Sequence, residues 1–183
     1  MRTRFRRCQT KTGIQVFTKK FAPVKKSAVR EVILQQLRQE LARQSNAAQM
    51  AREEAVSEES RAQNKWDTHS QEAAYLAEGQ AKLAAEIGAS IELYATLPLP
   101  DLAAGDVIAL GAVVEIESAG GVSAWYFIGP RAGGMEVELE GQILNVLTPQ
   151  SPLGRQLMGK RAGDEVAVAG RGAPVVQRIL SVH

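Results

Sequence analysis

Residues 148–166 read Thr-Pro-Gln-Ser-Pro-Leu-Gly-Arg-Gln-Leu-Met-Gly-Lys-Arg-Ala-Gly-Asp-Glu-Val, a stretch with a helix start and a helix stop. Ser151 is a favoured N-cap residue, and Pro152 suits the first helical position because its missing N–H has no partner there. Gly159 predicts the end of this short helix. The run Glu165–Val168 then predicts a strand, so the stretch indicates a small helix set among strands.

Short apolar runs on both sides of this helix predict a β-rich domain over residues 107–183. The domain follows a linker at 96–106 that starts with two closely spaced prolines, and glycine is frequent beyond it. Turn residues between runs rich in Val, Ile and aromatic residues are typical of short strands. The predicted strands are Val107–Ile116, Trp125–Ile128, Met135–Leu139, Ile143–Leu147, Glu165–Val168 and Val175–Leu180.

The segment before the linker has a helical pattern. It contains no proline between Pro23 and Pro98, and Ser27 is placed to cap a first helix. Apolar and small residues recur in alternating steps of three and four, which is the heptad pattern of a coiled coil. The first set is Leu34, Leu37, Leu41, Gln44, Ala48, Ala51 and Ala55; the second is His69, Ala73, Leu76, Gln80, Leu83, Ile87, Ser90 and Tyr94.

The two heptad sets predict an antiparallel helical hairpin over residues 27–95. Opposing positions have a constant index sum of 124 in five pairs, and this register places Gln44 opposite Gln80 as a polar layer that fixes it. The five pairs are Leu37 with Ile87, Leu41 with Leu83, Gln44 with Gln80, Ala48 with Leu76, and Ala51 with Ala73.

The tip of this hairpin is predicted near residues 57–67. Two capping boxes compete for the start of the second helix, Ser60 with Gln63 and Thr68 with Gln71. The first gives arms of nearly equal length and is preferred. The predicted fold class is α+β, with an N-terminal antiparallel coiled coil followed by a β-rich domain.

The formal net charge of +2 is an average over unlike segments. Residues 1–26 hold nine basic residues and no acidic one, which leaves 13 basic and 20 acidic residues in the rest of the chain. The arm is predicted to be a disordered extension; a nucleic-acid-binding arm and an Arg-rich targeting segment are the alternatives. The body behind it is acidic.

Other features of the composition exclude several classes of protein. The single cysteine, Cys8, excludes an intramolecular disulfide and fits a reducing compartment. No apolar run approaches the roughly 18 residues that a membrane span needs. We therefore expect a cytoplasmic protein with no membrane partner.

The C-terminal domain resembles that of the Gre family of bacterial transcription elongation factors. The resemblance is carried by residues 148–166, with their serine-proline pair, short helix, Gly-Lys and Gly-Asp. Residues 107–114, with Leu110-Gly111, look like the family's first strand, and residues 126–129 look like its second. A helical hairpin, a linker and this domain also follow in the family's order, so the resemblance covers residues 27–183 and leaves out the basic arm.

The resemblance implies an FKBP-like fold for the second domain and a function in transcription. It implies an accessory factor, not an enzyme, that binds RNA polymerase, inserts its coiled coil in the secondary channel and stimulates cleavage of backtracked transcripts. It further implies a monomer that regulates transcription, that meets DNA and RNA mainly through the elongation complex, and that is associated with the bacterial nucleoid through the polymerase. The family motif implies polymerase-binding roles, beside structural ones, for Ser151, Pro152, Leu153, Gly154, Gly159, Lys160, Gly163 and Asp164.

In the family, an Asp and a Glu at the hairpin tip help to hold a Mg²⁺ ion that is transient and shared with the polymerase active site; the resemblance implies no other cofactor. Carboxylate oxygens suit this task because they complete the oxygen shell of a hard cation. Aligning Asn64 and Trp66 with the family's Asn and aromatic puts Gln63 and Ser60 at the carboxylate positions.

Three interpretations of the altered tip remain open. Glu58 and Glu59 can substitute as metal ligands and catalytic carboxylates, and Asp67 with Glu72 offers a second pair. Glu53, Glu54, Glu58 and Glu59 can instead form a solvated helix face.

Two other functions are alternatives to transcript cleavage. The first is a non-cleaving regulator that occupies the same channel of the polymerase. The second is a nucleic-acid-binding protein that binds through residues 1–26.

Overall fold

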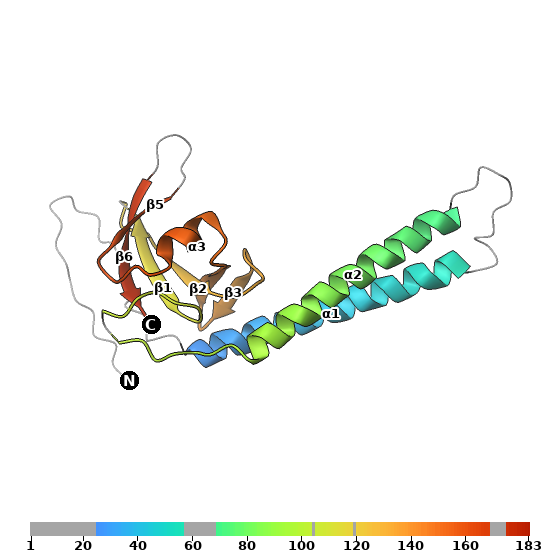
Figure 1. The fold of residues 1–183 in the computed structure, drawn as a ribbon, viewed down its shortest axis with the longest axis horizontal. Coiled ribbons are helices and arrows are strands. Elements are labelled where there is room, and N and C mark those ends of the chain that lie inside the picture. Colours follow the sequence, from blue (N-terminus) through green and yellow to red (C-terminus); the bar gives the residue numbers. More distant parts are fainter. Residues whose placement is uncertain (1–24, 57–68, 104, 119, 169–174) are drawn as a thin grey trace.

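A long helical hairpin and a six-stranded sheet make up the described part of the chain. The computed structural model describes residues 25–56, 69–103, 105–118, 120–168 and 175–183. Two helices come first and the strands follow, with one short helix among them (Figure 1), which confirms the predicted α+β class. The elements are α1 Lys26–Val56, α2 His69–Ala95, β1 Val113–Ser118, β2 Ser123–Ile128, β3 Glu136–Leu139, β4 Gln142–Leu147, α3 Pro152–Leu157, β5 Glu165–Val168 and β6 Val175–Val182.

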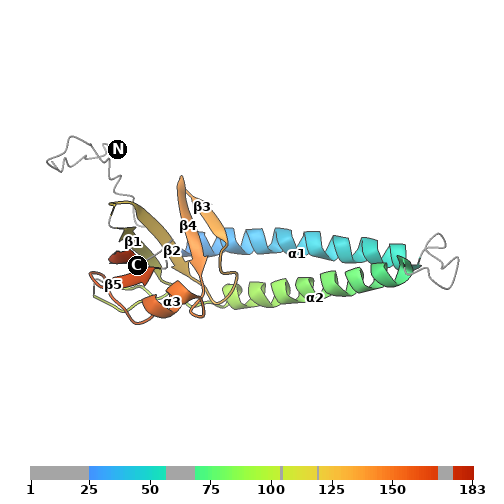
Figure 2. The same cartoon turned by 90° about the horizontal axis from the view of Figure 1, so that it is seen from above.

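Helices α1 and α2 run antiparallel, side by side, and extend away from the sheet (Figures 1 and 2). The 31 residues of α1 span about 45 Å at 1.5 Å per residue. The predicted tip at 57–67 lies outside the described residues, as do the arm up to residue 24 and the capping residues Ser60 and Thr68.

The start of α1 differs by one residue from the prediction. The Lys25 carbonyl accepts hydrogen bonds from the Ala28 N–H at 2.9 Å and the Val29 N–H at 3.1 Å. The helix therefore starts at Lys26, and Ser27 lies in its first turn instead of capping it. The Lys26 ammonium also donates to the Pro100 carbonyl, which ties this first turn to the linker.

The predicted seam of α1 is largely correct, whereas that of α2 is wrong at two leucines. Leu76 is 57% exposed and Leu83 is 47% exposed, so neither packs in the hairpin as predicted. Ala77 is buried in their place, next to a half-buried row that includes Ala81 and Ala84. A row of small side chains lets α1 approach closely, and this close approach leaves the bulkier leucines outside.

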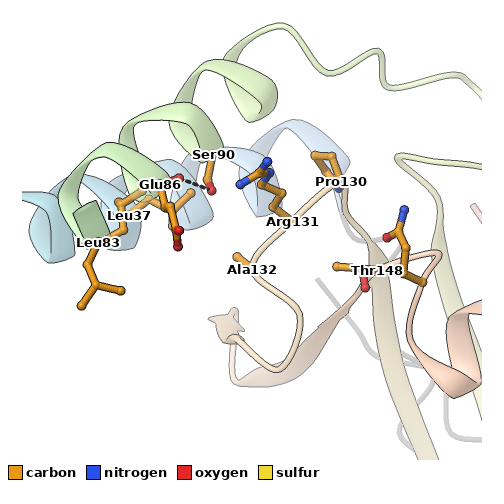
Figure 3. A pocket seen from close by; sticks show the side chains of 10 residues that line it. Leu37, Leu83, Glu86, Ser90, Pro130, Arg131, Ala132 and Thr148 are labelled. Carbon is orange, nitrogen blue, oxygen red and sulfur yellow. Dashed lines mark hydrogen bonds between the residues drawn. The ribbon is translucent and has the colours of Figure 1, made fainter. Parts of the chain in front are cut away.

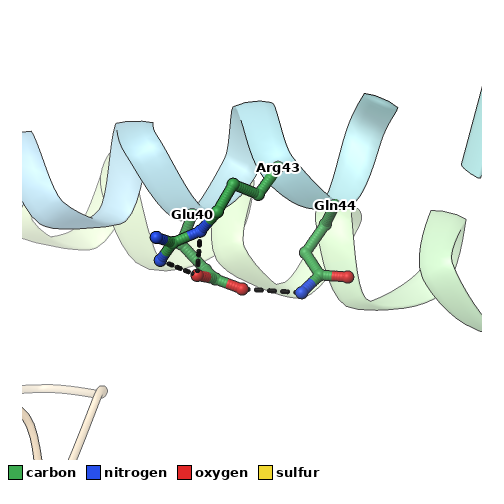
Figure 4. Close-up of polar contacts among 3 residues, drawn as sticks. All are labelled: Glu40, Arg43 and Gln44. Carbon is green, nitrogen blue, oxygen red and sulfur yellow. Dashed lines mark hydrogen bonds and ion pairs between the residues drawn. The ribbon is translucent and has the colours of Figure 1, made fainter. Parts of the chain in front are cut away.

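Gln44 and Gln80, the residues of the predicted polar layer, are both half-buried. Gln44 Nε2 donates to Glu40 Oε1 at 2.6 Å, and Arg43 Nε donates to Glu40 Oε2 at 3.0 Å (Figure 4). The Gln44 hydrogen bond, followed by the Arg43 hydrogen bonds, lowers the pKa of Glu40. Among the described residues, no donor reaches the buried Oε1 of Gln44 or of Gln80. Buried polar atoms without partners cost stability, and the pairing of Gln44 with Gln80 across the hairpin stays a prediction.

The sheet has the strand order β3-β4-β2-β1-β6-β5. Only β2 and β4 pair in parallel among its described strands; the other neighbours are antiparallel. Between β3 and β4, Glu140 and Gly141 both have positive φ angles, 53° and 77°. Two such residues form the tight turn whose twist matches a β-hairpin. This turn places β3 at the edge of the sheet, beside α1, where Gln36 Nε2 donates to the Glu136 carbonyl.

The first strand begins later than predicted. The run Val107–Ile116 was expected to be one strand, but β1 starts at Val113. Gly111 has a φ of 85°, and a Cβ on it would lie 2.6 Å from the Pro98 carbonyl oxygen. The chain therefore turns at Gly111 against the linker, and this turn separates the apolar residues before it from the strand.

Alternation along the strands divides the core between the two faces of the sheet. On β2, Phe127 belongs to a cluster with the base of the hairpin, and the next residue, Ile128, belongs to a cluster with α3. Successive strand side chains point to opposite faces, so each face has its own cover. The hairpin cluster includes Val29, Ile33, Leu34, Leu37, Tyr94, Val113, Phe127, Val137, Leu144 and Val146.

Tyr94, near the end of α2, is fully buried in this cluster. Its ring lies 6.5 Å from that of Phe127, and its hydroxyl donates to the Arg131 carbonyl at 2.7 Å. Burial raises the pKa of the hydroxyl, so it remains a donor. Space for the hydroxyl exists because residue 129 is glycine: a Cβ there would lie 2.1 Å from the Tyr94 oxygen.

We predict that Gly129→Ala destabilises the protein by about 1–3 kcal/mol, because the added methyl group must displace a fully buried ring. Urea denaturation measures the change. Gly120→Ala is the matched control, since its new Cβ would meet only the Ser118 hydroxyl oxygen at 4.0 Å. Equal midpoints for the two variants would contradict the tight contact between Gly129 and Tyr94.

Candidate partner-binding site

The tip carboxylates predicted to act on metal, Glu58, Glu59 and Asp67, lie outside the described residues, as do Gln63 and Trp66. Near the distal ends of the two helices, Glu53 of α1 and Glu72 of α2 are both exposed. Gln49 Nε2 donates to Glu53 Oε1 at 2.7 Å, as in an ordinary solvated helix face. The roles of the tip residues therefore remain predictions.

The motif around α3 is described in full, and Ser151 has the predicted local role. Its Oγ accepts a hydrogen bond from the Gly154 N–H at 3.0 Å and donates to the Thr148 carbonyl at 2.8 Å. Pro152 follows in the first turn of the helix, as predicted. These contacts hold the start of α3 against the end of β4.

Gly154 is needed for the same close approach. A Cβ at this position would lie 1.9 Å from the Thr148 carbonyl oxygen, a backbone atom that cannot move away without distorting the turn. Glycine is the residue that permits this contact between the helix and the chain before it. The family motif thus has a steric reason at this position.

The second half of the motif forms turns that join α3 to the sheet. Gly159 and Gly163 have positive φ angles, 79° and 96°, which favour glycine. The Gly159 N–H donates to the Ile108 carbonyl, and the Ile108 N–H donates to the Lys160 carbonyl at 2.7 Å. Asp164 Oδ2 accepts from the Arg161 N–H at 2.9 Å, closing the turn before β5.

Beside α3 lies an apolar groove of about 500 Å³. The side chain of Gln156 fixes one wall of it, because its amide exchanges two hydrogen bonds with the Ala167 backbone, at 2.8 and 3.0 Å. Pro152 is exposed at the rim and Leu153 is half-buried. The groove is lined by Leu147, Ser151, Pro152, Leu153, Gln156, Ala167 and Val168.

The motif residues therefore divide into two groups. Ser151, Gly154, Gly159, Gly163 and Asp164 shape the backbone. Pro152 and Leu153 line the groove, and Lys160 is half-buried outside its lining. Ser151, Pro152 and Leu153 lie together at this groove, whereas the turns at Gly159 and Gly163 do not line it.

A second groove, of about 570 Å³, lies between the base of the hairpin and the sheet (Figure 3). The sequence analysis missed it because its residues come from four distant segments and share no motif. Ala132 in this loop has a φ of 58°, which is unusual for a residue other than glycine. A backbone angle of this kind cannot be read from the sequence. The groove is lined by Leu37, Leu83, Glu86, Ile87, Ser90, Pro130, Arg131, Ala132, Thr148 and Gln150.

Two further searches concern only the described residues. No group of three histidine, cysteine, aspartate or glutamate residues there is placed to hold a metal ion. None of the helices there has the length and apolar character that crossing a membrane requires.

Comparison with known proteins identifies the C-terminal domain. Residues 103–183 match the family described as transcription elongation factor, GreA/GreB, C-terminal. Among solved structures, the chain is similar to GreA factor homolog 1 of Thermus thermophilus, with 22% identity, a TM-score of 0.34, and coverage of 82% of this chain and 94% of the other. No match was found among curated proteins.

Two other structures resemble the chain. Gfh1 of Thermus aquaticus shows 25% identity, a TM-score of 0.36, and coverage of 86% of this chain and 95% of the other. A GreA/GreB elongation factor of Nitrosomonas europaea shows 20% identity, a TM-score of 0.34, and coverage of 57% and 78%.

The matched residues include the whole α3 motif. Over these residues the C-terminal domain is similar to that of the Gre factors. The resemblance inferred from residues 148–166 is thereby confirmed.

We predict that Ser151→Ala lowers the free energy of unfolding by about 1 kcal/mol, because the Gly154 N–H loses its cap. Chemical denaturation measures the change. Ser123→Ala at the exposed start of β2 is the control, and we expect it to leave the midpoint nearly unchanged. An equally small effect of Ser151→Ala would contradict the capping role.

Proposed function

We propose that the chain is a transcription factor that binds RNA polymerase, inserts its hairpin in the secondary channel and stimulates cleavage of backtracked transcripts. The observation that carries the proposal is the match of residues 103–183 to the GreA/GreB C-terminal domain. The factor is an accessory protein in this proposal, and the hydrolysis is the polymerase's own. A monomer in the bacterial cytoplasm, at the nucleoid through the polymerase, is the form that we expect to act.

The shape of the hairpin supports this proposal. Beyond their base, which packs against the sheet, the two antiparallel helices extend away from it side by side (Figure 2). A rod of this kind can reach into a channel of a large partner while the sheet domain remains outside. Tyr94 and Leu97 are buried in the cluster between the hairpin base and the sheet, which holds the base in place. In this proposal, the orientation of the docked C-terminal domain therefore sets the direction of the hairpin.

The groove beside α3 supports docking of the C-terminal domain. Its lining combines exposed Pro152 and half-buried Leu153 with carbon-rich side chains of β4 and β5. Apolar side chains held by a rigid scaffold are the usual centre of a protein interface. We assign Pro152, Leu153 and Lys160 to polymerase contact, and the other five motif residues to the shape of that surface.

The tip carboxylates supply the chemistry in this proposal. Glu58 and Glu59, with Asp67 as the second choice, would complete the oxygen shell of a Mg²⁺ ion held mainly by the polymerase. The ion supplies a Lewis acid and a bound water nucleophile when present. The part of this chain is to deliver anionic oxygens to that position.

A non-cleaving regulator is the second candidate, favoured by one observation of sequence. Gln63 and Ser60 stand where the family motif has carboxylates. An amide and a hydroxyl are weaker ligands for a hard cation than a carboxylate. Such a chain would occupy the channel and compete with cleavage factors without promoting hydrolysis.

We predict that the purified chain releases 3′ fragments from a backtracked elongation complex in the presence of Mg²⁺. Glu58→Ala with Glu59→Ala should abolish cleavage, because the ion loses its added ligands, while binding to the polymerase persists. Gel analysis of labelled transcript measures cleavage, and competition with a labelled copy measures binding.

Asp67→Ala tests the second pair, and Glu53→Ala, at an exposed position of α1 that the proposal does not assign to the metal, is the control. Binding without any cleavage by the unsubstituted chain would overturn the cleavage function in favour of the non-cleaving regulator. Absence of binding would overturn both.

We predict that Leu153→Ser weakens binding to RNA polymerase by about 10- to 150-fold, since removal of a buried leucine contact costs roughly 1.5–3 kcal/mol. Val122→Ser is the matched control, because Val122 is 70% exposed and lies outside the groove. Thermal unfolding of both variants shows whether the fold persists. Equal affinities would contradict the assignment of the groove beside α3 to polymerase contact.

A further inference from the structure

The two leucines that the hairpin leaves outside define a patch on α2. Leu76 and Leu83 are two helical turns apart, and Tyr75, 74% exposed, adjoins them. Together with Gly79 these residues form what we call the α2 outer patch. In Figure 3, Leu83 projects away from both helices. The hairpin does not need the patch for its own packing, because Ala77 and its neighbours already fill the seam.

Gly79 is the second observation at this patch. It lies inside a 27-residue helix, has no positive φ angle, and a Cβ added to it would meet nothing within 4 Å. Glycine is the least favourable ordinary residue in a helix interior, so such a position usually has another reason. The exposed backbone at Gly79, between Leu76 and Leu83, forms a notch between two apolar ridges, and a notch of this kind suits close approach of another backbone.

Spacing and charge indicate the occupant. Ridges seven residues apart, about 10 Å along the axis, match the side-chain rows of a second helix. Helix α2 contains four acidic residues (Glu72, Glu78, Glu86, Glu92) and one basic residue (Lys82). A helix that packs on the patch is therefore favoured when its flanks are basic. The patch is also continuous with the groove at the hairpin base, because Leu83 lines both.

We infer that the α2 outer patch docks a basic amphipathic α-helix of RNA polymerase, with the notch at Gly79 receiving its closest approach. The inference rests on the proposed function, and it adds a side contact on the hairpin shaft to the contacts at the tip and at the C-terminal domain. A second copy of this chain is disfavoured as occupant, because it would bring two acidic α2 helices together.

Gly79→Ala and Gly88→Ala are a matched pair for the test. Both replace a helical glycine of α2 whose new Cβ meets nothing within 4 Å, and both should raise the melting temperature. The two positions lie on opposite sides of the helix, at nine residues' separation. We expect Gly79→Ala to weaken binding of the full chain to core RNA polymerase about tenfold, because the methyl group fills the notch. Gly88→Ala should bind like the unsubstituted chain.

Photo-crosslinking identifies the occupant. p-Benzoyl-phenylalanine at position 76 or 83 should crosslink to a Lys- or Arg-rich helical segment of the polymerase, identified by mass spectrometry; the same group at exposed position 85 should not. Equal affinity of the two alanine variants, or crosslinks from position 83 to nucleic acid or to another copy of the chain, would overturn this inference alone. Failure of the unsubstituted chain to bind the polymerase would overturn the proposed function and this inference with it.

Discussion

Burial of Tyr94 at the junction of hairpin and sheet is the constraint on which the arrangement of the two parts depends. The ring fills the space between α1 and β2, and the hydroxyl reaches the Arg131 carbonyl in the loop after β2. A buried hydroxyl without a partner would be costly, so the loop must stay at hydrogen-bond distance. Gly129 leaves room for this contact, and the same loop forms one wall of the groove at the hairpin base. One side chain thus couples the direction of the hairpin to the shape of a surface beside it.

Local signals in the sequence predicted the C-terminal domain well. The short helix at α3 begins where Ser151 and Pro152 predict, because capping depends on neighbours within four residues. The strand at β5 has the predicted bounds, and β2, β3, β4 and β6 differ only at their ends. The error at β1 has a tertiary cause: Gly111 turns because the Pro98 carbonyl packs against it, and no local pattern contains that contact.

The α2 seam failed for a related reason. A heptad count assigns leucines to the interface by their hydrophobicity, whereas packing depends on how closely two helices can approach. Alanines one position further along allow α1 to lie closer, so Leu76 and Leu83 are displaced to the surface. The alanines in the seam therefore leave Leu76 and Leu83 exposed in the α2 outer patch. The groove residues on α3 were predicted from the motif, whereas the groove at the hairpin base, formed by distant segments, was not.

The α3 motif combines residues that shape the backbone with residues that line a groove. Gly154 cannot be another residue without displacing the Thr148 carbonyl, and Ser151 holds the same turn, so these positions are constrained before any partner is considered. Leu153 and Pro152 are then presented at a groove whose wall Gln156 fixes through two backbone hydrogen bonds. A rigid backbone lowers the entropy that binding must overcome, since the apolar side chains are already in place. Under the proposed function, the residues that build the turn would contribute to recognition through the geometry that they impose on Pro152 and Leu153.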